Sequence, residues 1–374
     1  MYYILSFVAL IIVEWGLCAY CADSHIARSV VRDSNSRELI KKGWEKKFCV
    51  VVCAEMILFA GFRALTIGAD TSTYLNALTY YKSLPQGEIL SAKLVYPFDF
   101  EIGYFFLTKL CAYLNFSSTM FLLLIATMTY VPLITFVYKY SKNPLISVLV
   151  YFAFGLFAYS VGLFRQMIAL SICLCAVPYI RKRKLIQYLL LCAFASLFHL
   201  SALIMIPFYF LNYLDLRKNK TKFYILVIVL EILCFIFARS IIIEILKNFK
   251  LYAGYEGGKY DVQGGSYFNL IFLNILLFLG MFVVVPRVDK FDTICVKGIA
   301  VACIIQSCSY AMGIMGRLVC YYSIYEMILI PLVAENLVKE KSIVKITTVI
   351  LLFGLIFISL KNNILMQNYH FIWG

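Results

Sequence analysis

The run MFLLLIATMTYVPLITFVY, residues 120–138, decides the class of fold. It carries no charged residue and approaches the roughly 20 apolar residues that a membrane-spanning helix needs. Similar runs, separated by short polar breaks, fill nearly the whole chain of 374 residues, of which 63% are hydrophobic and only 14% are charged. Soluble proteins carry about 25% charged residues. The sequence therefore excludes a soluble enzyme and predicts an all-α, polytopic integral membrane protein with a single multi-spanning domain over residues 1–374.

The charge and the cysteines agree with this class of protein. The formal net charge is +14, an excess that membrane proteins usually place in cytoplasmic loops, so we predict no nucleic-acid partner. The 13 cysteines lie mostly inside apolar runs, without the spacing of a zinc site or a disulfide framework. They are predicted to pack as small hydrophobic residues. The first apolar run, residues 2–20, lacks the basic start and cleavage site of a signal peptide and is predicted to be the first helix.

Basic segments determine the predicted topology through the positive-inside rule. The segments 21–47, 139–142, 181–184, 217–222 and 339–341 are rich in lysine and arginine and are placed in the cytoplasm, which leaves both chain ends outside. About 11 to 12 transmembrane helices result. They are predicted near residues 2–20, 48–62, 120–138, 145–161, 166–180, 185–198, 200–213, 223–243, 267–285, 293–313, 318–338 and 343–359.

Residues 101–116 are predicted not to span the membrane. The segment is short and carries Glu101 and Lys109. A span here would also move the basic segment 181–184 to the outside. We therefore predict a short interfacial or re-entrant helix on the outer face, which the composition of an interfacial helix permits.

The predicted topology places six polar residues that are far apart in sequence at the outer membrane boundary. They are Arg63, Asp70, Glu101, Arg165, His199 and Arg317. We therefore predict that the outer segments 63–118 and 244–266 contribute to an active site. A lipid pyrophosphate is a dense anion, and a guanidinium holds such an anion through paired, charge-assisted hydrogen bonds. The alternative is that each arginine only snorkels at a helix end.

The other polar residues in this set also have structural alternatives. Asp70 follows Gly68, whose backbone freedom permits an unusual turn. Asp70 caps a helix that begins at Thr71, or orients Arg63 or a sugar hydroxyl, or does both. Glu101 either suits a helix N-terminus or transfers a proton. His199 stands at a predicted turn between two short helices and is either a hydrogen-bonded structural residue or a base.

No cofactor and no metal are predicted. His25 and His370 fall in a predicted cytoplasmic loop and in the tail, so no histidine cluster is expected around His199. Magnesium held by carboxylates and substrate phosphates is the alternative.

Four motifs stand between residues 50 and 212. They are FR at 62–63 followed by Gly68, Asp70 and Tyr74, then FEIGY at 100–104, FRQMIALS at 164–171 and FHLSA at 198–202. Together they resemble the EpsG family of Wzy-type polysaccharide polymerases. Beyond residue 212 the resemblance is weaker and is carried by Arg317 and by the tyrosines at 321 and 322.

The resemblance implies a glycosyltransferase of the bacterial plasma (inner) membrane. Such enzymes polymerise undecaprenyl-pyrophosphate-linked oligosaccharide repeat units on the outer leaflet, facing the periplasm or cell exterior, into O-antigen, capsule or exopolysaccharide. The implied partners are the lipid-linked glycan donor and acceptor, membrane lipid and a chain-length regulator protein. The alternative is a flippase or transporter of the same lipid-linked oligosaccharide, which would place its cations along a central cavity. A membrane acyltransferase is a further alternative.

The resemblance also guides the roles that we expect. The expected catalytic residues are Glu101, His199, Arg165 and Arg317, and the expected substrate-binding residues are Arg63, Asp70, Tyr74, Tyr104, Gln166 and Tyr321. We expect Arg165 and Arg317 to hold the departing pyrophosphate. Arg63 with Asp70 would fix the donor or acceptor. Either Glu101 or His199 would take the proton of the acceptor hydroxyl.

Overall fold

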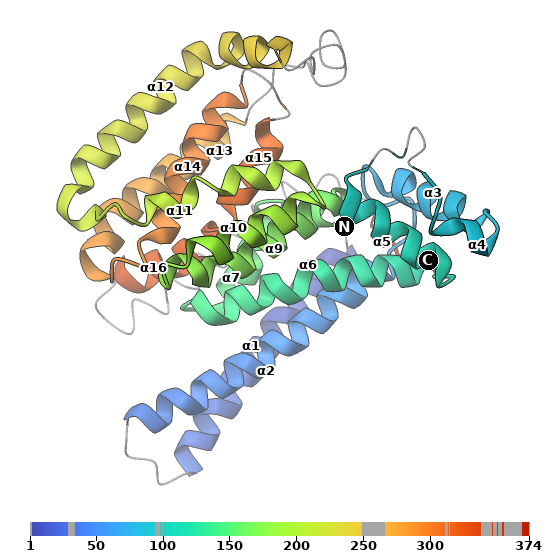
Figure 1. Ribbon diagram of the computed structural model, residues 1–374. Coiled ribbons are helices and arrows are strands. Elements are labelled where there is room, and N and C mark those ends of the chain that lie inside the picture. The colour runs from blue at the N-terminus through green and yellow to red at the C-terminus, as the bar shows by residue number, and fades with distance from the viewer. Residues whose placement is uncertain are drawn as a thin grey trace. The chain divides into compact units, whose positions relative to one another are not determined.

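A computed structural model describes residues 2–28, 34–93, 98, 100–248, 266–310, 313, 315–337, 346, 350, 354 and 369–373. Over these residues the protein is helical (Figure 1), and the β-structure among them is one isolated bridge between Arg63 and Phe371. The chain divides into two compact units. The first comprises Met1–Pro178, Ile186–Leu203 and Val349–Gly374, and the second comprises Tyr179–Leu185 and Ile204–Thr348.

The helices that lie wholly or mostly in the first unit run from α1 to α10. They are α1 (Tyr2–Arg28), α2 (Ser34–Gly61), α3 (Thr71–Lys82), α4 (Gln86–Ile89), α5 (Ile102–Tyr113), α6 (Ser118–Tyr140), α7 (Pro144–Ala153), α8 (Leu156–Gly162), α9 (Phe164–Arg181) and α10 (Leu185–Ser196). A 3-10 helix, Leu200–Met205, follows α10. α2 packs against α1 and α6, and α3 packs against α5.

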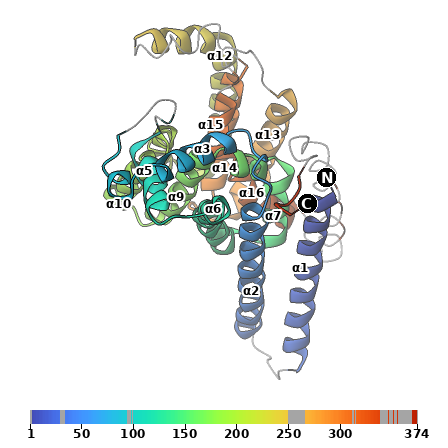
Figure 2. The same ribbon diagram turned by 90° about the vertical axis from the view of Figure 1, so that its right-hand side faces the viewer.

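α1 and α2 form an antiparallel hairpin (Figure 2). Phe7 stacks on Phe59 with ring centroids 4.4 Å apart, and Trp15 meets Phe48 edge-on at 4.9 Å. The first half of α2 is polar, and its buried residues begin at Phe48. Apolar packing therefore holds one end of the hairpin, while most of its charged residues lie toward the other end.

Residues 369–373 return to the end of α2. The backbone amide of Ala64 donates to the carbonyl of His370 at 2.9 Å. The hydroxyl of Tyr369 donates to the carbonyl of Phe59, and the two rings stack 4.4 Å apart. Two segments far apart in sequence are thus joined by backbone and side-chain contacts.

A sharp bend separates α7 from α8. The two helices lie at 65°, and Gly155 between them has a φ of +76°, in the left-handed region where glycine is favoured. α8 ends at Gly162, and α9 begins at Phe164. The first turn of α9 is therefore placed directly by the end of α8.

The second unit is built around α14. Its described elements are α11 (Phe208–Leu211), α12 (Leu216–Asn248), α13 (Tyr267–Leu279), a π-helical turn (Gly280–Val284), a 3-10 turn (Val285–Arg287), α14 (Ile294–Cys308), α15 (Met315–Ser323) and α16 (Glu326–Leu337). α14 packs against α12, α13 and α15. One buried carboxylate of this unit has an amide partner, since the Asn274 side chain donates to Oε2 of Glu231 at 2.8 Å.

Several helices are long and apolar enough to cross a membrane, as expected for an all-α membrane protein. In the described part of the chain there are 5 of them, or up to 7 if two bent pairs, α7 with α8 and α15 with α16, each count as one span. The five are Tyr3–Ile26, Ser118–Tyr140, Phe164–Arg181, Leu216–Ser240 and Tyr267–Arg287.

The predicted count of 11 to 12 spans is not confirmed by these helices. The segments Leu185–Ser196, Leu200–Leu211 and Ile294–Cys308 are apolar but shorter, and the predicted span 343–359 falls almost entirely outside the described residues. So do residues 249–265 of the predicted outer segment 244–266. The predicted break at His199 is confirmed, because α10 ends at Ser196 and the next helical turn begins at Leu200.

α5 has 12 residues. At 1.5 Å per residue such a helix is too short to cross the hydrocarbon core by itself. Its placement in the outer interface stays a prediction.

Candidate active site

The carboxylate of Glu101 joins three segments of the first unit. Its Oε1 accepts hydrogen bonds from Nδ1 of His199 at 2.6 Å and from the backbone amide of Leu200 at 3.3 Å. Its Oε2 forms an ion pair with the guanidinium of Arg165. Three of the four predicted catalytic residues, which lie in FEIGY, FRQMIALS and FHLSA, therefore meet in one cluster.

Gly103 brings Glu101 to this position. The Gly103 amide donates to the carbonyl of Leu197 at 2.8 Å, at the end of α10. A Cβ at residue 103 would lie only 2.8 Å from the same oxygen, closer than van der Waals contact permits. A glycine here lets the first turn of α5 approach the segment that carries His199.

The environment of Glu101 keeps its carboxyl group ionised. Its side chain is 22% exposed. Burial by itself would raise the pKa of Glu101, but the hydrogen bond from His199 and the charge of Arg165 lower that pKa to about 2. A carboxylate this acidic has little tendency to take a proton at neutral pH.

His199 is left with one ring nitrogen available. Because the ionised Glu101 carboxylate can only accept, its contact with Nδ1 assigns the imidazole proton to Nδ1. The other nitrogen, Nε2, has no hydrogen-bond partner among the described residues, and the side chain is 30% exposed. A neutral imidazole in this tautomer presents a lone pair at Nε2.

Aromatic rings hold the guanidinium of Arg165. It lies 4.8 Å from the ring centroid of Phe100 and 5.9 Å from that of Tyr74, and Tyr74 in turn stacks on Phe164 at 4.6 Å. The Nε of Arg165 is buried without a partner in the described part of the chain. The rings and Glu101 together fix the guanidinium in one place.

Arg63 has a different environment from Arg165. It is 2% exposed, and its guanidinium donates to the carbonyls of Ile67 at 3.3 Å, Val161 at 3.0 Å and Ala60. Val161 belongs to the last turn of α8, whose carbonyls have no partner within the helix. These contacts support a structural role for Arg63 at the α8–α9 turn.

The turn from Gly68 to Thr71 supports the same helix end. Gly68 has a φ of +103°, and a Cβ there would lie 2.1 Å from the carbonyl oxygen of Val161, so the predicted unusual turn is confirmed. The Thr71 hydroxyl lies 3.2 Å from that oxygen. α3 begins at Thr71 as predicted, but the side chain of Asp70 makes no capping hydrogen bond. Of the two readings of Asp70, the side-chain cap is wrong, because the hydroxyl of Thr71 and the backbone make the contacts at this turn.

The other predicted binding residues are mostly buried. Tyr74 is 3% exposed, Tyr104 is fully buried, and Gln166 is also buried. The rings of Tyr74 and Tyr104 lie 5.3 Å apart, so they support the cluster from within the first unit. Arg317 and Tyr321 lie on α15 in the second unit, and Tyr321 is buried there.

Two contributors were missed from the sequence. Gly103 stands inside the FEIGY motif. The need for a glycine there becomes visible only in the structure, where a Cβ would clash with the backbone of Leu197. Lys109 is buried, and its ammonium donates to the carbonyls of Leu90 and Ala92, the latter at 2.9 Å. It thereby holds the segment after α4 against α5.

Over the described residues, no group of three His, Cys, Asp or Glu side chains is arranged to hold a metal ion.

The sequence was compared with known proteins. No curated protein and no solved structure matches it. The sequence model of the EpsG family matches residues 46–372, which is most of the chain and includes Glu101, Arg165 and His199. The chain therefore belongs to the EpsG family.

Proposed function

We propose that this EpsG-family protein is a membrane glycosyltransferase that polymerises undecaprenyl-pyrophosphate-linked oligosaccharide repeat units on the outer leaflet of the plasma membrane. Family membership supports a polysaccharide polymerase-type membrane protein. The observation that carries the proposal is the cluster in which Glu101 contacts both His199 and Arg165. It combines a base with a fixed cation, the two groups that this transfer needs.

His199 is the proposed base. Its Nε2 takes the proton of the acceptor sugar hydroxyl as the oxygen attacks. Glu101 is a positioning residue, which holds the imidazole through Nδ1 and stabilises the imidazolium that forms. The low pKa of Glu101 favours this division of roles over direct proton transfer to the carboxylate.

The proposed transfer breaks one bond and forms one bond at the anomeric carbon of the growing glycan. The acceptor oxygen bonds to that carbon, and the bond from the carbon to the pyrophosphate oxygen breaks. Undecaprenyl pyrophosphate leaves with the electron pair. Arg165, whose side chain is 26% exposed, offers the leaving anion its positive charge and the terminal N–H groups that Glu101 does not use, so charge-assisted hydrogen bonds can replace a proton donor.

Asp70, Arg317 and Tyr321 are proposed as further substrate contacts. The carboxylate of Asp70, which does not cap α3, accepts from sugar hydroxyls. Arg317, on α15, is proposed to contact the pyrophosphate, and Tyr321 to support it from the same helix.

The test is gel analysis of surface polysaccharide from a deletion strain complemented with variants. His199→Ala, Glu101→Ala, Arg165→Ala and Arg317→Ala should each lose the ladder of long chains and leave single repeat units, while His25→Ala, the matched histidine control, keeps the ladder. Membrane abundance is measured for every variant. A wild-type ladder from His199→Ala would contradict its role as base. Accumulation of unexported repeat units on the cytoplasmic leaflet would favour the flippase alternative.

A further inference from the structure

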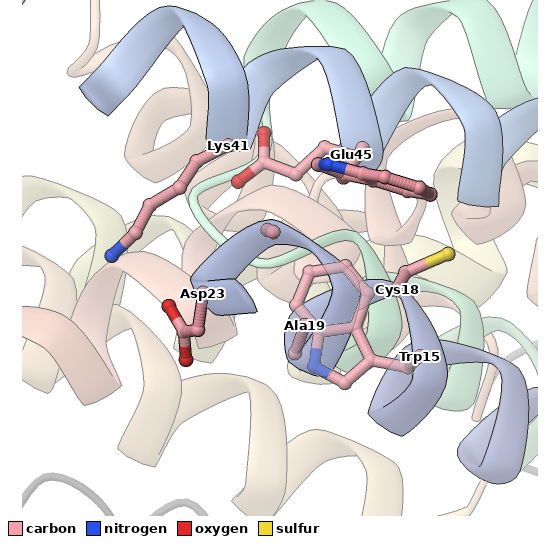
Figure 3. Close-up of a pocket in the computed structure, with 8 residues that line it drawn as sticks. Trp15, Cys18, Ala19, Asp23, Lys41 and Glu45 are labelled. Atoms are coloured by element: carbon pink, nitrogen blue, oxygen red, sulfur yellow. The ribbon is translucent and has the colours of Figure 1, made fainter. Parts of the chain in front are cut away.

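A cavity of about 250 Å³ lies between α1 and α2 (Figure 3). No residue of the Glu101 cluster lines it. Two half-buried tryptophans, Trp15 and Trp44, give it apolar walls, and Asp23, Lys41 and Glu45 add charged groups. An ordered water takes up about 30 Å³, so this space is large enough for a small polar group of several heavy atoms.

Two opposite charges face this cavity without pairing. Asp23 on α1 and Lys41 on α2 are exposed, and neither forms an ion pair or hydrogen bond with a described residue. Figure 3 shows both at one side of the cavity, with Trp15 at the other. Glu45, by contrast, is paired with Lys42 at 3.2 Å. Unpaired charges of both signs around one space favour a ligand that itself carries both charges.

The residues around the cavity follow the pattern expected at an edge of a membrane. Trp15 contacts Phe48, where the apolar part of α2 begins. Trp44 lies one turn beyond Phe48 and Lys41 two turns beyond it. Tryptophan is enriched at the level of lipid headgroups. The apolar walls and charged rim therefore match the boundary between the acyl chains and the headgroup of a phospholipid.

We propose that this cavity binds the headgroup of a phosphoethanolamine lipid. Lys41 pairs with the phosphate, Asp23 accepts hydrogen bonds from the primary ammonium, and Trp15 and Trp44 cover the glycerol region. The site is separate from the chemistry proposed for Glu101 and stands whether or not that chemistry is correct.

The surroundings distinguish ethanolamine from other headgroups. A choline headgroup has no N–H to donate to Asp23 and is recognised by open aromatic faces, but the ammonium of Lys47 already lies 3.8 Å from the ring centroid of Trp44. A glycerol headgroup has no cation, so Asp23 would stay unpaired and would repel the lipid phosphate.

Tryptophan fluorescence offers a direct test. The chain has 3 tryptophans, and Trp373→Phe leaves only the two that line the cavity. The full chain is reconstituted in three sets of phosphatidylcholine vesicles. Each set contains one brominated lipid, phosphatidylethanolamine, phosphatidylcholine or phosphatidylglycerol, at the same mole fraction. We expect the ethanolamine lipid to quench with an apparent affinity about two- to fivefold higher than the others, the scale of one or two exposed ion pairs.

Charge variants then locate the preference. Asp23→Asn and Lys41→Gln should abolish it, whereas Glu38→Gln and Lys46→Gln, matched controls on α2 outside the cavity lining, should keep it. Equal quenching by the three lipids, which needs no variant, would overturn the proposal. So would a preference for phosphatidylglycerol, or one that survives both cavity variants. Relief of the quenching by an equal concentration of free phosphoethanolamine would overturn the lipid as the occupant.

Discussion

Glu101 has two neighbours that decide its chemistry, His199 and Arg165. Both favour the ionised carboxylate, and the pKa of Glu101 falls to about 2 in spite of its partial burial. An isolated glutamate at a membrane interface would have a raised pKa and could act as a base. The sequence could not decide between these two outcomes, because His199 stands 98 residues away along the chain.

The depressed pKa of Glu101 predicts how stability depends on pH. A glutamate in an unfolded chain has a pKa of about 4.3, above the value of about 2 in the folded protein. Glu101 therefore contributes its full stabilisation above about pH 5 and loses it as the pH falls towards 2. In detergent, the Tm of the wild type should exceed that of Glu101→Gln at pH 7, and the gap should narrow between pH 5 and 3. A gap that does not change with pH would contradict the ion-pair role.

Gly103 offers a second test at the residue scale. Gly103→Ala forces the first turn of α5 away from Leu197 and displaces Glu101. A displacement of about 1 Å at a catalytic group can lower a rate by about 100-fold, so we expect a comparable loss of polymerisation in membranes that hold normal amounts of protein. Gly87→Ala is the control, because nothing lies within 4 Å of its added Cβ. Equal activity of the two variants would show that the approach of α5 to α10 is not needed.

At the scale of elements, the α8–α9 turn depends on contacts from the segment that joins α2 to α3. Arg63 and Thr71 both reach the Val161 carbonyl, and α9 then begins with Phe164 and Arg165. Arg63, which the sequence predicts to bind substrate, thus supports α9, the helix that carries Arg165. Residue type and spacing could not reveal this, since they do not fix the direction in which a long side chain points.

Replacing Arg63 tests this support. Arg63→Met keeps the length of the side chain but leaves several buried carbonyls without a donor, each at a cost of about 1–3 kcal/mol. We expect a clearly lower Tm for the detergent-solubilised protein, and Thr71→Val should lower it less, since Val161 keeps its contact with Arg63. Lys46→Met, an exposed site on α2, is the control. An unchanged Tm for Arg63→Met would leave the guanidinium available for substrate after all.

The helices themselves were largely predictable, and their breaks were less so. The apolar run 120–138 became α6, and the short pair around His199 was anticipated from its length. The sequence predicts a single span over residues 145–161, which contain the 65° bend between α7 and α8. Hydropathy could not predict this bend, because it reports composition but not the φ of Gly155. Some apolar runs form helices of only 12 to 15 residues, such as α10 and α14. For this reason the number of spans predicted from apolar runs is higher than the number of helices long enough to cross a membrane.

At the scale of the whole molecule, the positive-inside rule makes a testable statement about topology. Reporter fusions after residue 30 should show a cytoplasmic location, and fusions after residue 116 should show an external one. The reason is the excess of lysine and arginine in residues 21–47. A fusion after residue 141 serves as the internal control, because it is predicted to be cytoplasmic. An external reporter at residue 30 would reverse the predicted face of the Glu101 cluster.

The return of residues 369–373 to the end of α2 has a consequence for biosynthesis. Phe59 and Tyr369, which are in contact, are 310 residues apart in sequence, and at a translation rate of roughly 5–20 residues per second Tyr369 is made about 15–60 s after Phe59. During that interval the ring of Phe59 and the carbonyls near Arg63 lack their last partner. A nascent chain stalled before residue 369 should therefore expose this end of α2 to the membrane insertase and to quality-control proteases, and the docking of residues 369–373 would protect it.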